Sequence, residues 1–292
     1  DCTVCTTLVD TIVPGRIRDP KEAAAVAERL GYEDPFLAVR EPFQMWGIQG
    51  DESLKERLPF VKAGLPGVFV TPDVTPYKKR KVRILNGAHT AFVPGSWVAG
   101  FDIVRDCMHD ETVRGFMNTM LYDEVIPTLA ADLDVEDCKA FAAAVENRFD
   151  NPFIDHALLS ICLNSTAKWR ARDLPTLKDY AAETGNLPKC LATSLATLIS
   201  FYTQELVSRE GDGLHLRRSD GTEYTAQDDA FVLDFYAAHA GADDAELVHD
   251  VLSNEQMWGE DLTQIAGLEE FVVNALAVVR SEGVKQAFAN AQ

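Results

Sequence analysis

Apolar residues recur at helical spacing along most of the chain, and this pattern predicts a mainly helical fold. The first predicted helix, Pro20–Leu30, follows Asp19, a residue suited to N-capping, and is rich in strong helix formers. Further amphipathic or buried helices are predicted over Asp110–Leu133 (interrupted near Pro127), Val135–Phe149, Asn151–Leu163, Cys190–Glu205, Ala226–Ala240, Ala242–Leu252 and Gly267–Phe288. We expect one mainly helical domain over residues 1–292.

Strand patterns are few and short. Phe43–Ile48 and Val68–Thr71 are aromatic or β-branched and bounded by Pro and Gly, so they could pair as a small antiparallel ribbon. The polar, Gly-containing stretch Glu210–Thr222 is predicted to be a loop with a short hairpin. The predicted fold class is therefore mainly α, multi-helical, with a small antiparallel β element.

Charge narrows the range of partners. The chain carries 46 acidic against 27 basic residues, a formal net charge of −19. Nucleic acids and anionic membrane surfaces attract Lys and Arg, so this balance argues against both. No run approaches the roughly 20 apolar residues that span a bilayer, and no signal peptide is visible. We expect a cytoplasmic protein.

The cysteines offer one metal hypothesis. Cys2, Cys5, Cys107 and His109 could form a zinc site, but a lone C-x-x-C without a second pair is weak support. Reduced thiols are the favoured interpretation, and we expect no metal.

One stretch has a pattern suited to carbonyl–alcohol chemistry. Thr75-Pro76 is typical of a helix start, with Thr75 as the N-cap and Pro76 at the first helical position. Lys81, Asn86 and His89 follow as K-x-x-x-x-N-x-x-H. At about 100° per residue of an α-helix, the three would project within one broad face. A Lys with a lowered pKa can act as general acid or base, and an Asn amide can donate to an alkoxide.

Alternatives to that interpretation remain open. A basic run at a helix start is usually a solvated face, and Asn86-Gly87 could mark a break in the helix. Lys78, one turn before Lys81, competes for the basic role. The like charges that would lower the pKa of Lys81 are Lys78, Lys79, Arg80 and Arg83.

A second polar cluster lies downstream. Asn151-Pro152 resembles a helix cap followed by a first-turn Pro. Arg148 just before it could bind a carboxylate or hydroxyl in a bidentate way, or tie two helices together. Lys168, Arg170 and Arg172 could meet an anionic substrate, or be ordinary surface cations.

These motifs resemble a known family. The K-x-x-x-x-N-x-x-H helix, the preceding Pro-Tyr, a Leu-Val-Asp-x-Ile near the start and an R-F-x-N-P-x-I element are similar to the mannitol dehydrogenase family of polyol-specific long-chain dehydrogenases. The resemblance runs from Thr7 to about Gly267. A hexuronate-reducing branch is indicated by the stretches TLVDTIVPGRIRDPKEAA, RKVRILNGAHTAFVP, EVIPTL, RFDNPFIDH and DLTQIAGL.

The resemblance implies a dinucleotide-binding domain followed by a helical substrate domain. This chain resembles only the second, together with the segment that leads into it, and has neither a G-x-G-x-x-G nor a P-loop motif. The chain starts at Asp1 rather than Met. We therefore expect a nucleotide-binding domain in a longer parent chain, NAD bound mainly by that domain, and little activity from these residues alone.

Site residues follow from the resemblance one by one. It implies that Lys81 is the general acid/base and Asn86 an oxyanion donor. The residues expected to line the sugar site are His89, Arg148, Asp10 and, close by, Val9. His156 stands where mannitol dehydrogenases carry a substrate-contacting Lys. Members of the family typically use no catalytic metal.

The expected function is reversible, NADH-dependent reduction of D-tagaturonate to D-altronate in hexuronate breakdown. The partner would be a small sugar acid, with no nucleic acid or membrane. Fructuronate and mannitol or fructose are alternative substrates. A different class of function, a non-catalytic helical module that binds a sugar acid, is the other alternative.

Overall fold

The computed structural model describes residues 2–17 and 19–292. Asp1, and Arg18 within the stretch 7–24 quoted above, lie outside the described residues. Internal contacts divide the chain into two compact units. The first unit comprises Asp1–Lys81 and Phe153–Asp155, and the second Val82–Pro152 and His156–Gln292. One domain over 1–292 stays a prediction, because a domain is defined by independent folding as well as by contacts.

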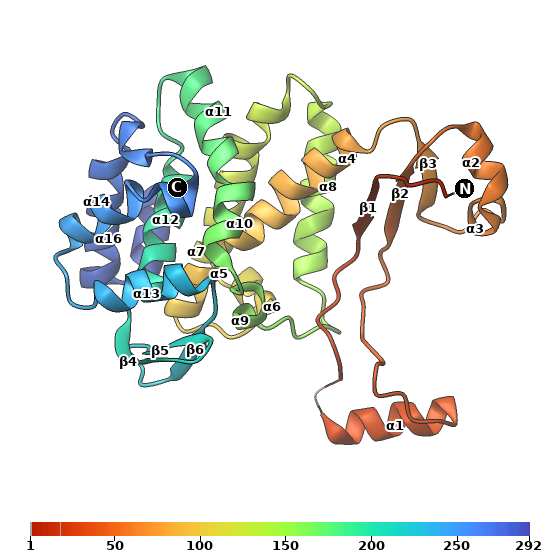
Figure 1. Ribbon diagram of the computed structural model, residues 1–292, viewed down its shortest axis with the longest axis horizontal. Coiled ribbons are helices and arrows are strands. Elements are labelled where there is room, and N and C mark those ends of the chain that lie inside the picture. Colours follow the sequence, from red (N-terminus) through yellow and green to blue (C-terminus); the bar gives the residue numbers. More distant parts are fainter. Residues whose placement is uncertain (1, 18) are drawn as a thin grey trace. The chain divides into compact units, whose positions relative to one another are not determined.

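The first unit contains a three-stranded sheet in the order β1-β2-β3 (Figure 1). Its strands are β1 (Thr7–Asp10), β2 (Met45–Gln49) and β3 (Val68–Thr71). β1 pairs with β2 antiparallel, but β2 pairs with β3 parallel, so the antiparallel ribbon predicted for these two segments is wrong. The physical reason is the connection between them, which is a long crossover and not a hairpin turn. It contains α2 (Glu52–Arg57) and α3 (Pro59–Lys62).

Local signals explain the helices of the first unit. The predicted helix α1 (Pro20–Leu30) is confirmed, and the Asp19 carboxylate accepts a hydrogen bond from the Lys21 amide at 2.8 Å. A second helix, α4 (Thr75–Arg80), begins at Thr75, whose amide donates to the Asp73 carboxylate at 2.8 Å. The predicted Thr75 cap is therefore one residue too late. Ile48 of β2, Val70 of β3 and Leu54 of α2 pack together as a small apolar core.

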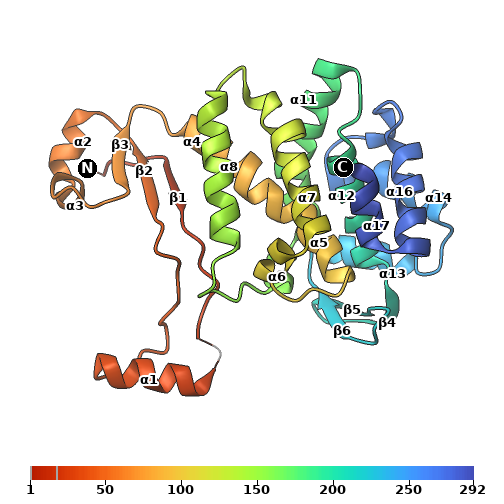
Figure 2. The same ribbon diagram turned by 180° about the vertical axis from the view of Figure 1, so that it is seen from behind.

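The second unit is a helical assembly with a small sheet (Figure 2). Its helices are α5 (Gly87–Val98), α6 (Val104–His109), α7 (Glu111–Thr119), η2 (Met120–Val125), η3 (Pro127–Leu129), α8 (Val135–Phe149), α9 (Leu158–Ile161), α10 (Ser165–Arg172), α11 (Leu174–Thr184), α12 (Lys189–Tyr202), α13 (Ala230–Ala238), α14 (Asp244–Leu252), α15 (Glu255–Trp258), η4 (Leu262–Gln264), α16 (Leu268–Glu282) and α17 (Val284–Ala291). The mainly helical fold class is confirmed.

The core of this unit is built around α5 and α12. Both are buried along nearly their whole length, as expected of helices that are apolar on every side. α12 packs against α5, α16 and α17. The start of α12 is held by Glu124 of η2, whose two carboxylate oxygens accept from the Cys190 and Leu191 amides at 2.7 and 3.0 Å. Burial raises the pKa of this carboxyl to about 7.

The predicted hairpin is confirmed and belongs to an antiparallel sheet. Its strands are β4 (Glu205–Glu210), β5 (Gly213–Arg217) and β6 (Glu223–Ala226). Of the predicted helices, Val135–Phe149 is confirmed in full. The prediction for Asn151–Leu163 is wrong except for α9, and Asn151-Pro152 lies in a turn and caps no helix. Helices α10 and α11 were not predicted.

Among the residues that the structure describes, no helix is long and apolar enough to cross a membrane.

Candidate functional site

Lys81 follows α4, and the sheet of the first unit positions that helix. The Phe69 ring of β3 packs on the Tyr77 ring of α4 with centroids 5.2 Å apart. The Lys81 ammonium donates to the main-chain carbonyl of Val9 in β1 at 3.0 Å. Lys78, the rival for the basic role, is exposed. Packing and hydrogen bonding therefore favour Lys81 over Lys78.

Val9 and Asp10 lie on opposite sides of β1, as alternation along a strand requires. Val9 is about half exposed, at 53%, whereas Asp10 is buried, at 1%. An Asp that is almost fully buried is uncommon, so the position is consistent with a special role.

The helix that carries Lys81, Asn86 and His89 differs from the α-helix assumed from the sequence. Residues Lys81–Asn86 form a π-helix, η1, that runs on into α5. The estimate of about 100° per residue is therefore wrong for this stretch. A π-helix pairs residues i and i+5, so Lys81 and Asn86 are one turn apart on this helix. Asn86-Gly87 does not break the helix.

His89 lies in the interior of the second unit, with an exposed fraction of 6%. Its ring stacks on Phe149 with centroids 4.0 Å apart and meets the His156 ring edge-on at 5.5 Å. Its Nε2 atom is buried and has no hydrogen-bond partner among the described residues. A buried polar atom without a partner is costly, and a ligand is one way to satisfy it.

The surroundings of His89 are electrically positive. Burial lowers its pKa well below the usual range, and the charges of His156, Arg172, Arg148 and Lys168 lower it further. Burial also lowers the pKa of His156, to about 4. Both imidazoles are therefore neutral near pH 7, when the nearby Arg and Lys side chains carry the positive charge.

Arg172 of α10 contacts the start of α5. Its Nη1 atom donates to the Thr90 hydroxyl at 2.9 Å and to the Asn86 carbonyl at 3.5 Å, and the same hydroxyl donates to that carbonyl at 2.9 Å. Lys168, one turn earlier on α10, donates to the Ile161 carbonyl at 2.8 Å. Burial lowers the pKa values of both cations. Of the predicted cation run, Arg170 is exposed.

The structure brings predicted site residues together within each unit. In the first, Lys81 contacts Val9, the neighbour of Asp10 in β1. In the second, His89 meets His156 and lies within electrostatic reach of Arg148. Arg83, which was expected to depress the pKa of Lys81, instead forms an ion pair with Asp179 at 3.0 Å.

Two neighbours of the site were missed by sequence reasoning. Thr90 was missed because its contact with Arg172 joins segments far apart in the chain. Asp173 is buried, which raises its pKa well above the usual range, and its Oδ2 lacks a partner among the described residues. A Cβ on Gly87 would come within 2.8 Å of the Asp173 Oδ1, so glycine permits this close approach. Asp173 directly follows the predicted cation run, which is the signal that could have found it.

The zinc hypothesis gains no support. Burial raises the pKa of the Cys107 thiol to about 12, and His109 pairs with Asp150 at 2.7 Å. Across residues 2–17 and 19–292, no group of three or more Cys, His, Asp or Glu is arranged to hold a metal ion.

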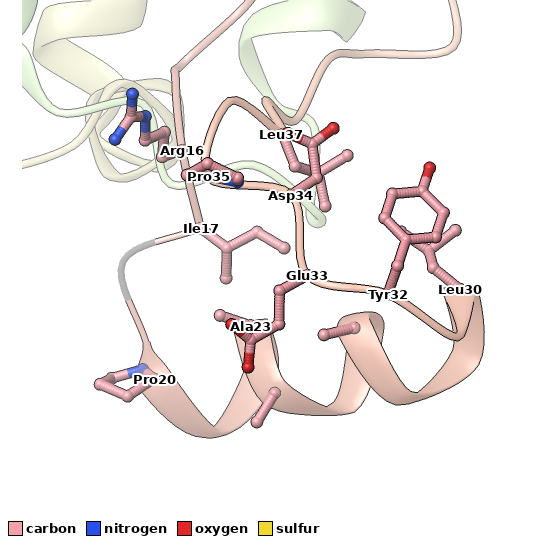
Figure 3. A pocket seen from close by; sticks show the side chains of 12 residues that line it. Arg16, Ile17, Pro20, Ala23, Leu30, Tyr32, Glu33, Asp34, Pro35 and Leu37 are labelled. Atoms are coloured by element: carbon pink, nitrogen blue, oxygen red, sulfur yellow. The ribbon is translucent and has the colours of Figure 1, made fainter.

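A large hollow lies in the first unit, beside α1 (Figure 3). Side chains of α1, among them Ala23 and Leu30, face it together with residues 32–35 and Leu37. α1 buries none of its residues. The lining is mostly apolar, and its charged side chains are Arg16, Glu33 and Asp34.

Residues 73–280 match the family described as mannitol dehydrogenase C-terminal domain. The chain belongs to this family. The resemblance stated from the sequence motifs is therefore confirmed at the level of the family.

Similar curated proteins carry a more specific name. The chain is 44% identical over 291 residues to altronate oxidoreductase of Klebsiella pneumoniae (strain 342), covering 98% of this chain and 56% of that protein. It is 41% identical over 293 residues to altronate oxidoreductase of Yersinia enterocolitica serotype O:8 / biotype 1B, covering 98% of this chain and 57% of that protein. The chain thus spans a little over half the length of these relatives.

Two solved structures share the fold. One is Pseudomonas fluorescens mannitol 2-dehydrogenase in a ternary complex with NAD and D-mannitol, with a TM-score of 0.78, 22% identity, and coverage of 98% of this chain and 54% of that one. The other is a D-sorbitol dehydrogenase in substrate-free form, with a TM-score of 0.74, 21% identity, and coverage of 97% and 54%. At these identities the likeness is evidence of the fold alone.

Proposed function

We propose that this chain is the substrate-binding and catalytic part of an NADH-dependent oxidoreductase that reduces D-tagaturonate to D-altronate. The observation that carries the proposal is the match of 41–44% identity, along nearly the whole chain, to proteins named altronate oxidoreductase. The cations around His89 support a sugar acid over a neutral polyol, because a carboxylate would offset their charge.

In the proposed reaction the keto carbon gains a hydride and its oxygen gains a proton. The hydride would come from a nicotinamide cofactor bound by the rest of the enzyme. Lys81 gives a proton from its ammonium group to the oxygen as the carbonyl π pair moves onto it, and is left as a neutral amine. The Asn86 amide donates a hydrogen bond to the same oxygen. In the reverse direction the neutral amine takes the proton back.

The remaining roles concern substrate binding. We assign His89, Arg148, His156, Asp10 and Val9 to the sugar site, with His89 close to the reacting centre. The chain has no Gly-rich phosphate-binding motif, so its residues do not fit a dinucleotide cradle, and we assign none of them to NAD. We propose that a preceding nucleotide-binding domain holds the cofactor and that the enzyme is cytoplasmic.

The test is NADH oxidation, followed by absorbance, in a protein in which this chain follows a nucleotide-binding domain. D-tagaturonate, D-fructuronate and D-fructose are compared. Fastest turnover of D-tagaturonate supports the proposal. A preference for either other substrate contradicts the substrate assignment, and a lack of turnover with all three contradicts the enzymatic assignment.

A further inference from the structure

Two cations of α10 are placed unusually. Lys168 and Arg172 are four residues apart, so they lie on the same face of the helix, where like charges repel. Both are partly buried, and burial makes that repulsion stronger than at a solvated surface. Arg172 also ends the helix, where a cation is favourable, but this does not explain Lys168 in the first turn.

No acidic side chain of the described residues forms an ion pair with either cation. Their hydrogen bonds go to neutral oxygens: the Ile161 carbonyl for Lys168, and the Thr90 hydroxyl and Asn86 carbonyl for Arg172. The bonds of Arg172 use Nη1, so Nη2 and Nε have no acceptor within the described part of the chain. A guanidinium edge that keeps two donors available matches a carboxylate.

Two carboxyl groups, those of Asp228 and Asp173, lie near these cations without forming an ion pair with either of them. The Asp228 Oδ2 accepts from the Tyr202 hydroxyl and from the Thr166 amide. Burial raises the pKa of Asp173, and its charge interacts with that of Arg172, but the two side chains form no ion pair. These carboxylates act on the two cations only through space, so an ion-pair partner on this face of α10 is left to a ligand.

The third observation is the buried Nε2 of His89, which has no partner in the described residues. His89 precedes Thr90, to which Arg172 is hydrogen-bonded, and α10 packs directly on α5. An oxygen-rich ligand on this face would satisfy the Arg172 donors and the imidazole together.

We propose that Arg172, assisted by Lys168, binds the carboxylate of a sugar-acid substrate beside His89 and thereby selects sugar acids over neutral polyols. This inference rests on the proposed function, and it assigns the specificity to two side chains of one helix. Arg148 is then left to bind hydroxyl groups.

The experiment compares two ligands that differ mainly at one carbon. D-altronate and D-altritol, the neutral hexitol of the same carbon chain, are titrated into the 292-residue chain by calorimetry or ligand-observed NMR. We expect D-altronate to bind at least about tenfold more tightly. Charge-assisted hydrogen bonds contribute more binding free energy than neutral ones, and the difference corresponds to about that factor in affinity. Arg172→Gln should remove the preference and leave D-altritol binding unchanged.

Arg170→Gln is the matched control, since it makes the same chemical change on the exposed side of α10 and should keep the preference. If Arg172→Gln does not fold, Lys168→Gln tests the same claim with a partial loss of preference. If Arg172→Gln lowers the affinity for both ligands equally, Arg172 only stabilises α5, and the proposal is overturned. The proposal is also overturned if the preference for D-altronate persists in Arg172→Gln and Lys168→Gln, or if the unmutated 292-residue chain shows no such preference.

The two proposals fail separately. Turnover of D-tagaturonate with no Arg172-dependent preference for the acid overturns this inference alone. An Arg172-dependent preference without NADH-dependent turnover overturns the enzymatic function alone.

Discussion

The hollow beside α1 and the buried polar cluster around His89 differ in the chemistry of the side chains that they contain. The hollow has a volume of about 590 Å³ and a mostly apolar lining. In the cluster, which comprises Asn86, His89, Arg148, His156, Lys168 and Arg172, burial lowers the pKa of both histidines and of two cations. Strongly perturbed groups gather where a protein performs chemistry, so the comparison favours the cluster as the functional region.

The comparison also shows why volume alone is a poor guide. α1 buries none of its residues, and an exposed helix of this kind can leave a large hollow whose lining is mostly apolar. The cluster offers donors and an unsatisfied imidazole nitrogen. Substrate specificity depends on a few polar groups placed in this way.

The largest effect is expected at Lys81, on the helix that runs into the cluster. Lys81→Ala should lower turnover of D-tagaturonate by about 10²–10⁴-fold, because it removes the proton donor while the fold stays intact. Lys78→Ala, at the exposed neighbour, is the control and should change turnover little. Near-normal turnover in Lys81→Ala would show that another group moves the proton.

Titration of His156 should make stability depend on pH. Its folded pKa of about 4 lies below the usual 6.5, so the unfolded chain takes up a proton that the folded chain resists. Stability is then full above about pH 6.5 and is lost as the pH falls towards 4, by up to about 3 kcal/mol. His156→Gln should reduce this loss and leave the part due to His89.

The comparison for His156 is made in a Glu124→Gln background, measured by denaturant unfolding across the pH range. Glu124, whose folded pKa is about 7, acts in the opposite direction, since its contribution is lost as the pH rises from about 4.5 to 7. Equal acid sensitivity with and without His156 would contradict its burial as a neutral group.

Gly87→Ala tests how tightly the cluster is packed. The new Cβ would lie 2.8 Å from the Asp173 Oδ1, so Asp173 or the start of α5 has to shift. We expect a destabilisation of about 1–3 kcal/mol, measured by chemical denaturation. Unchanged stability would indicate that Asp173 moves freely, contrary to its burial.

The smallest effect is expected in the hollow. Leu30→Ser replaces a side chain that is already 44% exposed, so stability should change by no more than about 0.5 kcal/mol and the affinity for D-altronate not at all. Weaker D-altronate binding in this variant would place the substrate in the hollow and reverse the comparison.

Local signals predicted much of the helical structure. The Asp19 carboxylate caps α1 by accepting from the Lys21 amide, and the Asp134 carboxylate caps α8 by accepting from the Asp137 amide. Both helices were predicted with their observed bounds. The parallel pairing of β2 and β3 was not predicted, because it depends on the path of residues 50–67 and on pairing with β1. The π-helix at Lys81–Asn86 was missed because a change to i,i+5 bonding leaves no mark in the composition.

The candidate site was predicted as a set of residues but not as an arrangement. The spacing of Lys81, Asn86 and His89 was visible in the sequence, whereas the stacking of His89 on Phe149 joins helices far apart in the chain. The sequence did not distinguish substrate-binding cations from ordinary surface cations. Their burial does, because Arg172 is partly buried and Arg170 is exposed. Burial and long-range contact are the two quantities that a sequence pattern cannot supply.

Amide hydrogen exchange of the 292-residue chain, with and without D-altronate, tests most directly whether the cluster or the hollow binds the substrate. We expect slower exchange at residues 86–90 and 165–172 when the ligand is present, and no change at residues 20–37. Protection at residues 20–37 with none at 86–90 would contradict it.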